Sequence, residues 1–237
     1  MRNDAAPAPL AHAVVTGSSS GIGRAIAESL LAAGWQVSGL DVAQPAIVQA
    51  GFTPVPVDLA DGADIARAAA RLPAVDALVH AAGVLRVGPL GQLDHAGGEL
   101  MWRLHVDAAT RLADAIVPAM AARGQGRVVF IGSRVAQGMP GRGQYAATKA
   151  ALIALARSWA AEVAGQGVTV NVVSPAATAT GMLNDPARAG SAPRLPPIGR
   201  LIEPGEIAAL VGYLLSPSAA AITGQDIAIC GGSSLSR

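Results

Sequence analysis

The chain has 237 residues, with 17 lysines and arginines against 16 aspartates and glutamates. This balance, without a basic run or a basic-aromatic patch, argues against nucleic acid as a partner. Hydrophobic residues make up 51% of the chain, yet no apolar run reaches the roughly 18 residues of a membrane span, so we expect no membrane partner. The single cysteine, Cys230, excludes an intramolecular disulfide and fits a reducing compartment, so we expect a cytoplasmic location.

Short runs rich in β-branched residues alternate with longer segments rich in alanine and leucine. Residues 1–9 are polar, contain proline and lack the apolar segment of a signal peptide, which predicts a loose lead-in. The predicted strands are Ala13–Thr16, Gln36–Leu40, Pro54–Val57, Ala77–His80, Arg127–Ile131, Val168–Val173 and Asp226–Ile229. The predicted helices lie near Gly23–Ala33, Ala63–Leu72, Ala96–Arg123, Gln144–Gly165 and Pro204–Leu215.

This alternation predicts an α/β fold. The strands are nearly continuous apolar runs, which is typical of parallel strands buried on both faces. We therefore expect a Rossmann-type, doubly wound parallel sheet of about seven strands with helices on both faces. Because no repeat or interdomain linker is visible, residues 1–237 are predicted to form one domain. Residues 184–199, rich in Pro, Gly, Arg and Ala, are predicted to be a substrate lid.

A glycine-rich segment follows the first predicted strand and opens a helix. Glycines let the backbone approach a pyrophosphate, and the amides of a helix N-terminus bind phosphate. The spacing, G-x-x-x-G-x-G, differs from the usual dinucleotide fingerprint, so a plain glycine turn is the alternative. The residues expected to contact a cofactor here are Gly17, Ser19, Ser20, Gly21, Ile22 and Gly23.

Acidic and small residues follow the next three predicted strands. Asp41 is placed to accept hydrogen bonds from the ribose hydroxyls of NAD and to repel the 2′-phosphate of NADP, and its alternative role is a turn residue. Asp58, followed by Leu59, either meets the adenine amino group or caps its own loop. After the fourth strand, His80 is a candidate core histidine. The small residues Ala81, Ala82 and Gly83 would let the cofactor ribose lie against the backbone.

The predicted acid–base group is Tyr145. Lys149 lies at i+4 and therefore on the same helix face. An ammonium beside the phenol, together with an oxidised nicotinamide, favours the phenolate and brings its pKa, ordinarily ~10, towards neutrality. Tyr145 would then exchange a proton with an alcohol or carbonyl oxygen, and Ser133 would hydrogen-bond that oxygen. No metal-ligand cluster is visible, so no metal is expected.

Taken together, these motifs resemble those of the short-chain dehydrogenase/reductase family, nearly end to end. The stretches that carry the resemblance are Thr16–Gly23, Asp41, Asp58, Ala81–Gly83, Ser133, Tyr145 with Lys149, Asn171–Pro175 and Gly231–Gly232. The resemblance implies that Lys149 also binds the nicotinamide ribose. It implies that Pro175, Ala176, Thr178 and Thr180 lie by the carboxamide. It also implies a homotetramer formed through the long helices, with a dimer as the alternative.

Two positions depart from the family pattern. The family has an asparagine where this chain has His80. His105, with Asp107 as the next candidate, falls where the family has a structural-catalytic asparagine that holds a relay water. His105 either takes over that water, since imidazole both donates and accepts, or is a core histidine.

The prediction is an NAD-dependent oxidoreductase that moves a hydride between the cofactor and a small alcohol or ketone. Residues 81–88 are similar to dihydrodiol dehydrogenases that make dihydroxybenzoates, so a cyclic alcohol is one candidate substrate. The alternatives are an NADP-dependent 3-oxoacyl-type reductase and a non-catalytic NAD-binding regulatory module of the same fold. Candidate substrate-pocket residues are Leu85, Arg86, Val135, Ala136, Gln137, Met139, Gln144, Ala177, Met182 and Leu183.

Overall fold

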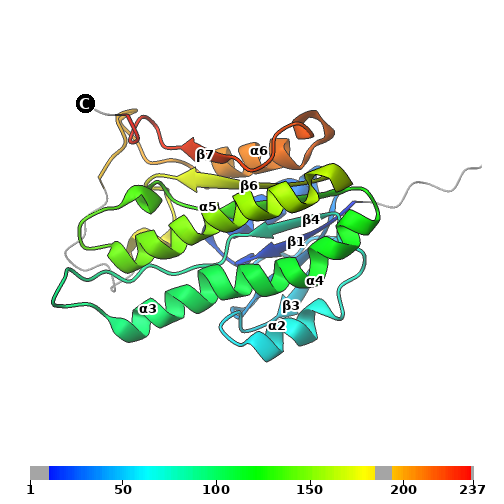
Figure 1. Ribbon diagram of the computed structural model, residues 1–237, viewed down its shortest axis with the longest axis horizontal. Coiled ribbons are helices and arrows are strands. Elements are labelled where there is room, and N and C mark those ends of the chain that lie inside the picture. The colour runs from blue at the N-terminus through cyan, green and yellow to red at the C-terminus, as the bar shows by residue number, and fades with distance from the viewer. Residues whose placement is uncertain (1–10, 185–193, 236–237) are drawn as a thin grey trace, which may run out of the picture.

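A sheet of seven parallel strands, in the order β3-β2-β1-β4-β5-β6-β7, lies at the centre of the protein (Figure 1). The structure is a computed structural model in which residues 11–184 and 194–235 are described. The strands are β1 (His12–Thr16), β2 (Gln36–Asp41), β3 (Phe52–Pro56), β4 (Ala77–His80), β5 (Gly126–Ile131), β6 (Val168–Pro175) and β7 (Asp226–Ile229). The predicted Rossmann-type fold is confirmed.

Burial separates the inner strands from the two edges. Every residue of β1, β4 and β6 is buried, as the continuous apolar runs predict. The edge strand β3 is largely exposed and carries Pro54 and Pro56, which an edge tolerates because one side of its backbone needs no ladder partner. It begins earlier than the predicted Pro54, because Phe52 pairs with Val37 and its ring covers Gly39.

Helices cover both faces of the sheet. The α-helices are α1 (Gly21–Ala32), α2 (Gly62–Ala69), α3 (His95–Trp102), α4 (Ala108–Ala122), α5 (Gly143–Val163) and α6 (Pro204–Leu215). One apolar core lies between the sheet and α2, α4 and α5, and a second lies between the sheet and α1 and α6. In Figure 1, α4 and α5 cross the front of the sheet and α6 lies behind it.

The shorter elements mark the ends of strands and helices. They are the π-turn η1 (Arg103–Asp107) and the 3-10 turns η2 (Arg134–Gln137), η3 (Ala164–Gln166), η4 (Gly181–Asn184) and η6 (Pro217–Ala219). The predicted single helix near Ala96–Arg123 is α3, η1 and α4 in succession, so a π-turn interrupts its regular periodicity.

The carboxyl ends of the parallel strands all point to one side of the sheet, the left in Figure 1. In a doubly wound sheet this edge is where ligands bind. The lead-in, residues 1–9, and residues 185–193 of the predicted lid lie outside the described residues. Among the helices of the described ranges, none is both long and apolar enough to span a membrane.

Candidate active site

A cavity of about 1080 Å³ opens at the carboxyl edge of the sheet. The predicted site residues that line it are Gly17, Ser20, Gly21, Ile22, Gly23, Ala81, Ala82, Gly83, His105, Ser133, Tyr145, Lys149, Pro175, Ala176, Thr178 and Thr180. The predicted pocket residues Leu85, Val135, Met139, Ala177, Met182 and Leu183 line it too, whereas Arg86, Ala136, Gln137 and Gln144 do not. One cavity therefore joins the glycine-rich turn to the predicted catalytic side chains.

The turn between β1 and α1 has the shape of a phosphate cradle. Gly17 has φ +68°, and a Cβ there would lie 2.9 Å from the Ala82 Cα atom. A Cβ on Gly23 would overlap the Gly17 carbonyl oxygen, so the turn closes this tightly only with glycine. Ser20, the N-cap residue of α1, makes no side-chain capping bond. The first amides of α1 thus keep the donors that a pyrophosphate requires, and the turn fits a dinucleotide.

Asp41 lies beside this turn rather than in the main cavity. Its Oδ2 accepts a hydrogen bond from the Ser19 amide at 2.9 Å, and its Oδ1 accepts one from the Ala43 amide at 2.9 Å. Ser19 and Asp41 line a separate small hollow at the end of β2. The carboxylate is therefore held beside the glycine-rich turn, as its predicted contact with the cofactor ribose requires.

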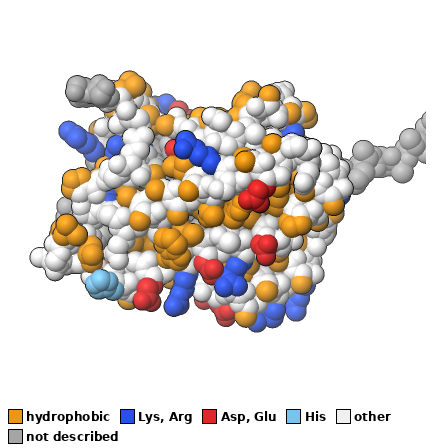
Figure 2. Space-filling model, in the orientation of Figure 1, with side chains coloured by type: hydrophobic (Ala, Val, Ile, Leu, Met, Phe, Trp, Pro, Cys, Tyr) orange, Lys and Arg blue, Asp and Glu red, His pale blue; other side chains and the backbone are white. Residues whose placement is uncertain are grey.

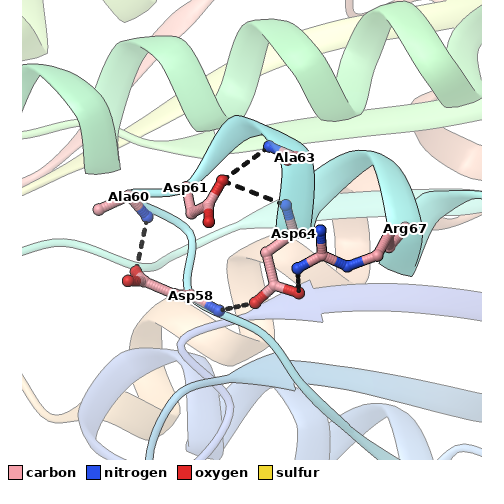
Figure 3. Close-up of polar contacts among 6 residues, drawn as sticks. All are labelled: Asp58, Ala60, Asp61, Ala63, Asp64 and Arg67. Carbon is pink, nitrogen blue, oxygen red and sulfur yellow. Dashed lines mark hydrogen bonds and ion pairs between the residues drawn. The ribbon is translucent and has the colours of Figure 1, made fainter.

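Asp58 takes part in a local network at the start of α2 (Figure 3). Its Oδ1 accepts from the Ala60 amide at 2.8 Å, while its own amide donates to Asp64 Oδ2 at 2.7 Å. Asp61 caps α2 by accepting from the Ala63 amide at 2.8 Å. Neither Asp58 nor Leu59 lines the main cavity, and the adenine contact stays a prediction.

Ser133, Tyr145 and Lys149 come together in the cavity from two elements. Ser133 follows β5 and caps η2, its Oγ accepting from the Val135 amide at 3.1 Å. Tyr145 and Lys149 lie one turn apart on α5, and the lysine Nζ lies 5.8 Å from the centre of the phenol ring. The spacing in the sequence thus predicts correctly that the two side chains lie on one helix face.

Lys149 is unusual in two respects. It is the only lysine in the sequence, all other basic side chains being arginine or histidine. It is also 5% exposed, and its Nζ donates to the Ile131 carbonyl oxygen at 2.8 Å. Burial lowers the pKa of Lys149 from 10.5 to about 7, because the charged form loses its hydration.

His80 is a hydrogen-bonded core histidine. Thr16 Oγ1 accepts from the amides of Ala81 and Ala82, both at 3.0 Å, so its hydroxyl hydrogen is left to donate to His80 Nδ1, also at 3.0 Å. The other ring nitrogen, Nε2, donates to the Leu104 carbonyl oxygen at 3.0 Å. Burial lowers the pKa of His80 to about 3, so the ring is neutral and ties the ends of β1 and β4 to η1.

His105, on η1, links the loop after β4 to α5. Its Nε2 accepts from the Val84 amide at 3.1 Å, which places the ring proton on Nδ1; Nδ1 donates to Thr148 Oγ1 at 2.8 Å. Thr148 in turn donates to the Tyr145 carbonyl oxygen at 2.8 Å, and the imidazole packs edge-on against the Tyr145 ring. Gly83 leaves room for this ring, since a Cβ there would lie 2.6 Å from His105 Nε2.

This arrangement favours the core-histidine alternative over the relay water. The side chain is fully buried, and both of its ring nitrogens already have protein partners. Burial also holds the pKa of His105 well below its usual range, so the ring stays neutral.

Replacing His105 with asparagine is expected to lower the unfolding free energy by about 1–3 kcal/mol, because the shorter amide cannot reach both Val84 and Thr148. Chemical denaturation measures this loss. His95→Asn on the exposed start of α3 is the matched control. An H105N protein of full stability and equal or higher activity would instead support the relay.

Three arginines in the cavity lining were not predicted from the sequence. They are Arg134, Arg142 and Arg194, and Gly232, Ser233 and Leu235 also line the cavity from beyond β7. Arg134 directly follows Ser133, so proximity to a predicted catalytic residue was the available signal. Arg194 lies inside the predicted lid, but nothing in the sequence pattern distinguishes it from other loop arginines.

Comparisons with known proteins establish the family of this chain. A family model described as enoyl-(acyl carrier protein) reductase matches residues 17–234. The chain is 37% identical over 234 residues to the 3-oxoacyl-[acyl-carrier-protein] reductase of Escherichia coli, covering 93% of this chain and 96% of that protein. It is also 37% identical over 238 residues to the 2,3-dihydro-2,3-dihydroxybenzoate dehydrogenase of the same species, with the same coverage of 93% and 96%.

A solved structure of a short chain dehydrogenase/reductase family protein matches with a TM-score of 0.86 and 36% identity, covering 94% of this chain and 97% of that one. The likeness therefore extends over nearly the whole length in sequence and in fold. The chain belongs to the short-chain dehydrogenase/reductase family, whose members are oxidoreductases that bind a nicotinamide cofactor.

Proposed function

We propose that the protein is an NAD-dependent oxidoreductase that interconverts a small secondary alcohol and its ketone, with Tyr145 as the general acid–base group. One observation supports this most strongly. Ser133, Tyr145 and Lys149 line the same cavity as the glycine-rich N-terminus of α1. A hydride donor or acceptor held on that turn and an alcohol held at Tyr145 would therefore share one cavity.

Each side chain has a defined part in this proposal. A nicotinamide cofactor held at the glycine-rich turn would supply the hydride acceptor for alcohol oxidation and the hydride donor for ketone reduction. The Tyr145 phenolate accepts the hydroxyl proton as the carbonyl forms, and the Ser133 hydroxyl donates a hydrogen bond to the substrate oxygen. Lys149 favours the phenolate in its ammonium form, and a negative phenolate in turn favours that ammonium.

The cofactor is proposed to be NAD because of the position of Asp41. Its carboxylate is fixed at the turn by the Ser19 and Ala43 amides. A 2′-phosphate beside it would be repelled by up to about 4 kcal/mol per charge pair at an effective dielectric near 20.

Asp41→Ala is expected to shift the ratio of kcat/KM values for NAD and NADP by about ten- to a hundredfold towards NADP, because the repulsion is removed. Steady-state kinetics with both cofactors measures this ratio. Asp114→Ala, which removes an exposed carboxylate on α4, is the control for charge alone. A preference of the unmodified protein for NADP would contradict the proposal.

Two observations bear on the substrate. The relatives include a 3-oxoacyl-[acyl-carrier-protein] reductase and a 2,3-dihydro-2,3-dihydroxybenzoate dehydrogenase, at equal identity. The first supports the alternative of an NADP-dependent 3-oxoacyl reductase, and the second supports a cyclic diol. A panel of cyclic diols, secondary alcohols and 3-oxoacyl thioesters, assayed with both cofactors, distinguishes them. Cofactor binding without turnover of any compound would favour the non-catalytic module.

We also propose a homotetramer in the cytoplasm, made of single-domain subunits. The outer face of α5 exposes the small side chains of Ala147, Ala150 and Ala154, which permit close helix packing. Much of the surface over α4 and α5 is hydrophobic or uncharged (Figure 2). Light scattering after size-exclusion chromatography measures the assembly, and a monomer at micromolar concentration would contradict it.

A further inference from the structure

The cavity lining is strongly unbalanced in charge. Besides Lys149 it contains Arg134, Arg142 and Arg194, whereas the lining residues within the described ranges include no aspartate or glutamate. Six arginines outside the cavity each lie within 4 Å of a carboxylate: Arg24, Arg67, Arg103, Arg111, Arg123 and Arg200. No described carboxylate neutralises Arg134 or Arg194 in this way. Arg134 and Arg194 therefore bring positive charge to the cavity, and no carboxylate among the described lining residues offsets it.

Two of the arginines adjoin the predicted catalytic residues in the sequence. Arg134 directly follows Ser133, and Arg142 is the N-cap residue of α5, three positions before Tyr145. The turn that fits the pyrophosphate, residues 17–23, contributes no cationic side chain to the lining. These arginines therefore adjoin Ser133 and Tyr145, which would hold the reacting oxygen. The amides at the N-terminus of α1 would bind the phosphates instead.

The surroundings strengthen the effect of these charges. Arg134 and Arg142 are both partly buried, and Val135, Met139 and Pro140 line the cavity between them in sequence. A guanidinium stays ionised at any accessible pH and offers a planar pair of donors that matches a carboxylate or phosphate. A cleft with low-dielectric walls and charge of one sign concentrates ligands of the opposite sign.

We propose that the substrate carries an anionic oxygen group, a carboxylate or a phosphate, which Arg134, assisted by Arg142 and Arg194, binds while Tyr145 and Ser133 hold the reacting oxygen. This inference rests on the proposed function and deepens it, because it names the chemical class of the substrate. In a carboxylate substrate, the carbon that bears the reacting oxygen would lie close to the anionic group. In a carrier-bound substrate, that carbon would lie far from the phosphate of the carrier arm.

Two matched pairs of substrates test the inference and separate the sources of the anion. The first pair is 3-hydroxycyclohexanecarboxylate and its methyl ester; the second is the 3-hydroxybutyryl thioester of 4′-phosphopantetheine and that of pantetheine. In one of the two pairs, the kcat/KM of the anionic member is expected to be at least about tenfold higher than that of its neutral partner. The ratio of the two kcat/KM values should fall as salt is added. Equal values for both members of both pairs would overturn the inference and leave the proposed function standing.

The arginine variants locate the binding group. Arg134→Gln is expected to raise KM for the preferred anionic member by about ten- to a hundredfold, with a smaller change in kcat and in the kinetics of its neutral partner. Arg194→Gln should have a smaller effect in the same direction. Arg71→Gln, an exposed arginine at the end of α2 that does not line the cavity, is the control for loss of one charge. If Arg71→Gln and Arg134→Gln behave alike, no local anion site exists.

A binding measurement keeps the two proposals distinguishable if no turnover is seen. Calorimetric titration of the protein with NAD present compares cyclohexanecarboxylate with its methyl ester, and phosphopantetheine with pantetheine. Preferential binding of one anion, lost in Arg134→Gln, would establish the anion site even where the oxidoreductase proposal fails. Equal binding of each pair would overturn the site itself.

Discussion

Replacing Tyr145 with phenylalanine is expected to lower kcat/KM for alcohol oxidation by about 10²- to 10⁴-fold, the usual contribution of a general acid–base group. The substitution removes one hydroxyl and keeps the ring that packs against His105. The fold and the affinity for NAD should therefore change little. Steady-state kinetics gives the activity, and fluorescence titration gives the cofactor affinity.

The chain provides a matched control, since it contains only one other tyrosine. Tyr213 lies on α6, is 48% exposed and does not line the cavity. Tyr213→Phe should retain the activity of the unmodified protein. If Y145F and Y213F were equally active, proton transfer would have to be assigned to another group and the proposed mechanism would fail.

The second large effect is a rise in stability with pH caused by Lys149. Burial lowers the pKa of Lys149 to about 7 in the folded protein, against 10.5 when the chain is unfolded. Between these values the unfolded chain binds the proton more readily, so raising the pH favours the folded state. Without bound cofactor, the contribution of Lys149 to the unfolding free energy should increase by about 3 kcal/mol from about pH 7 to about pH 10.

Lys149→Met isolates this contribution because it removes the amine and keeps an unbranched side chain that is only one atom shorter. Urea denaturation at several pH values should show the rise in the unmodified protein and a flatter curve in the variant. Loss of the hydrogen bond to the Ile131 carbonyl oxygen should lower the unfolding free energy of the variant by the same amount at every pH. Parallel curves for the two proteins would show that Lys149 titrates normally in the folded state.

The sole lysine also permits a direct measurement. After reductive ¹³C-methylation, the side-chain amine signal of the protein comes from one residue. Its chemical shift, followed against pH, should titrate near neutrality without cofactor. A titration near the ordinary value of 10.5 would contradict the expected burial.

The fold and the central part of the site could be predicted because both depend on local patterns. The continuous apolar runs of β1, β4 and β6 predict a buried parallel sheet, and a parallel sheet places all of its carboxyl ends at one edge. The helical spacing of Tyr145 and Lys149 predicts a shared face without knowledge of any tertiary contact. The length of β3 could not be predicted as well, since it depends on the packing of Phe52 over Gly39.

Other features depend on contacts between distant segments and therefore lie beyond local patterns. The sequence leaves open whether His105 holds a water, and only the joint positions of Val84 and Thr148 show how both ring nitrogens are engaged. The π-turn that carries His105 likewise has no signature in the apolar periodicity. The charge of the cavity arises from arginines on three separate segments, which become neighbours only in the folded chain.

The strand order has a consequence for how the protein is made. During synthesis each strand after the first emerges when its neighbour already exists: β2 beside β1, β3 beside β2, β4 on the free edge of β1, and then β5, β6 and β7 in turn. Each strand after β1 therefore finds a hydrogen-bonding partner that precedes it in the sequence. The nascent chain can therefore extend its sheet outward from β1 as translation proceeds, which shortens the time for which apolar strand edges are exposed to other chains.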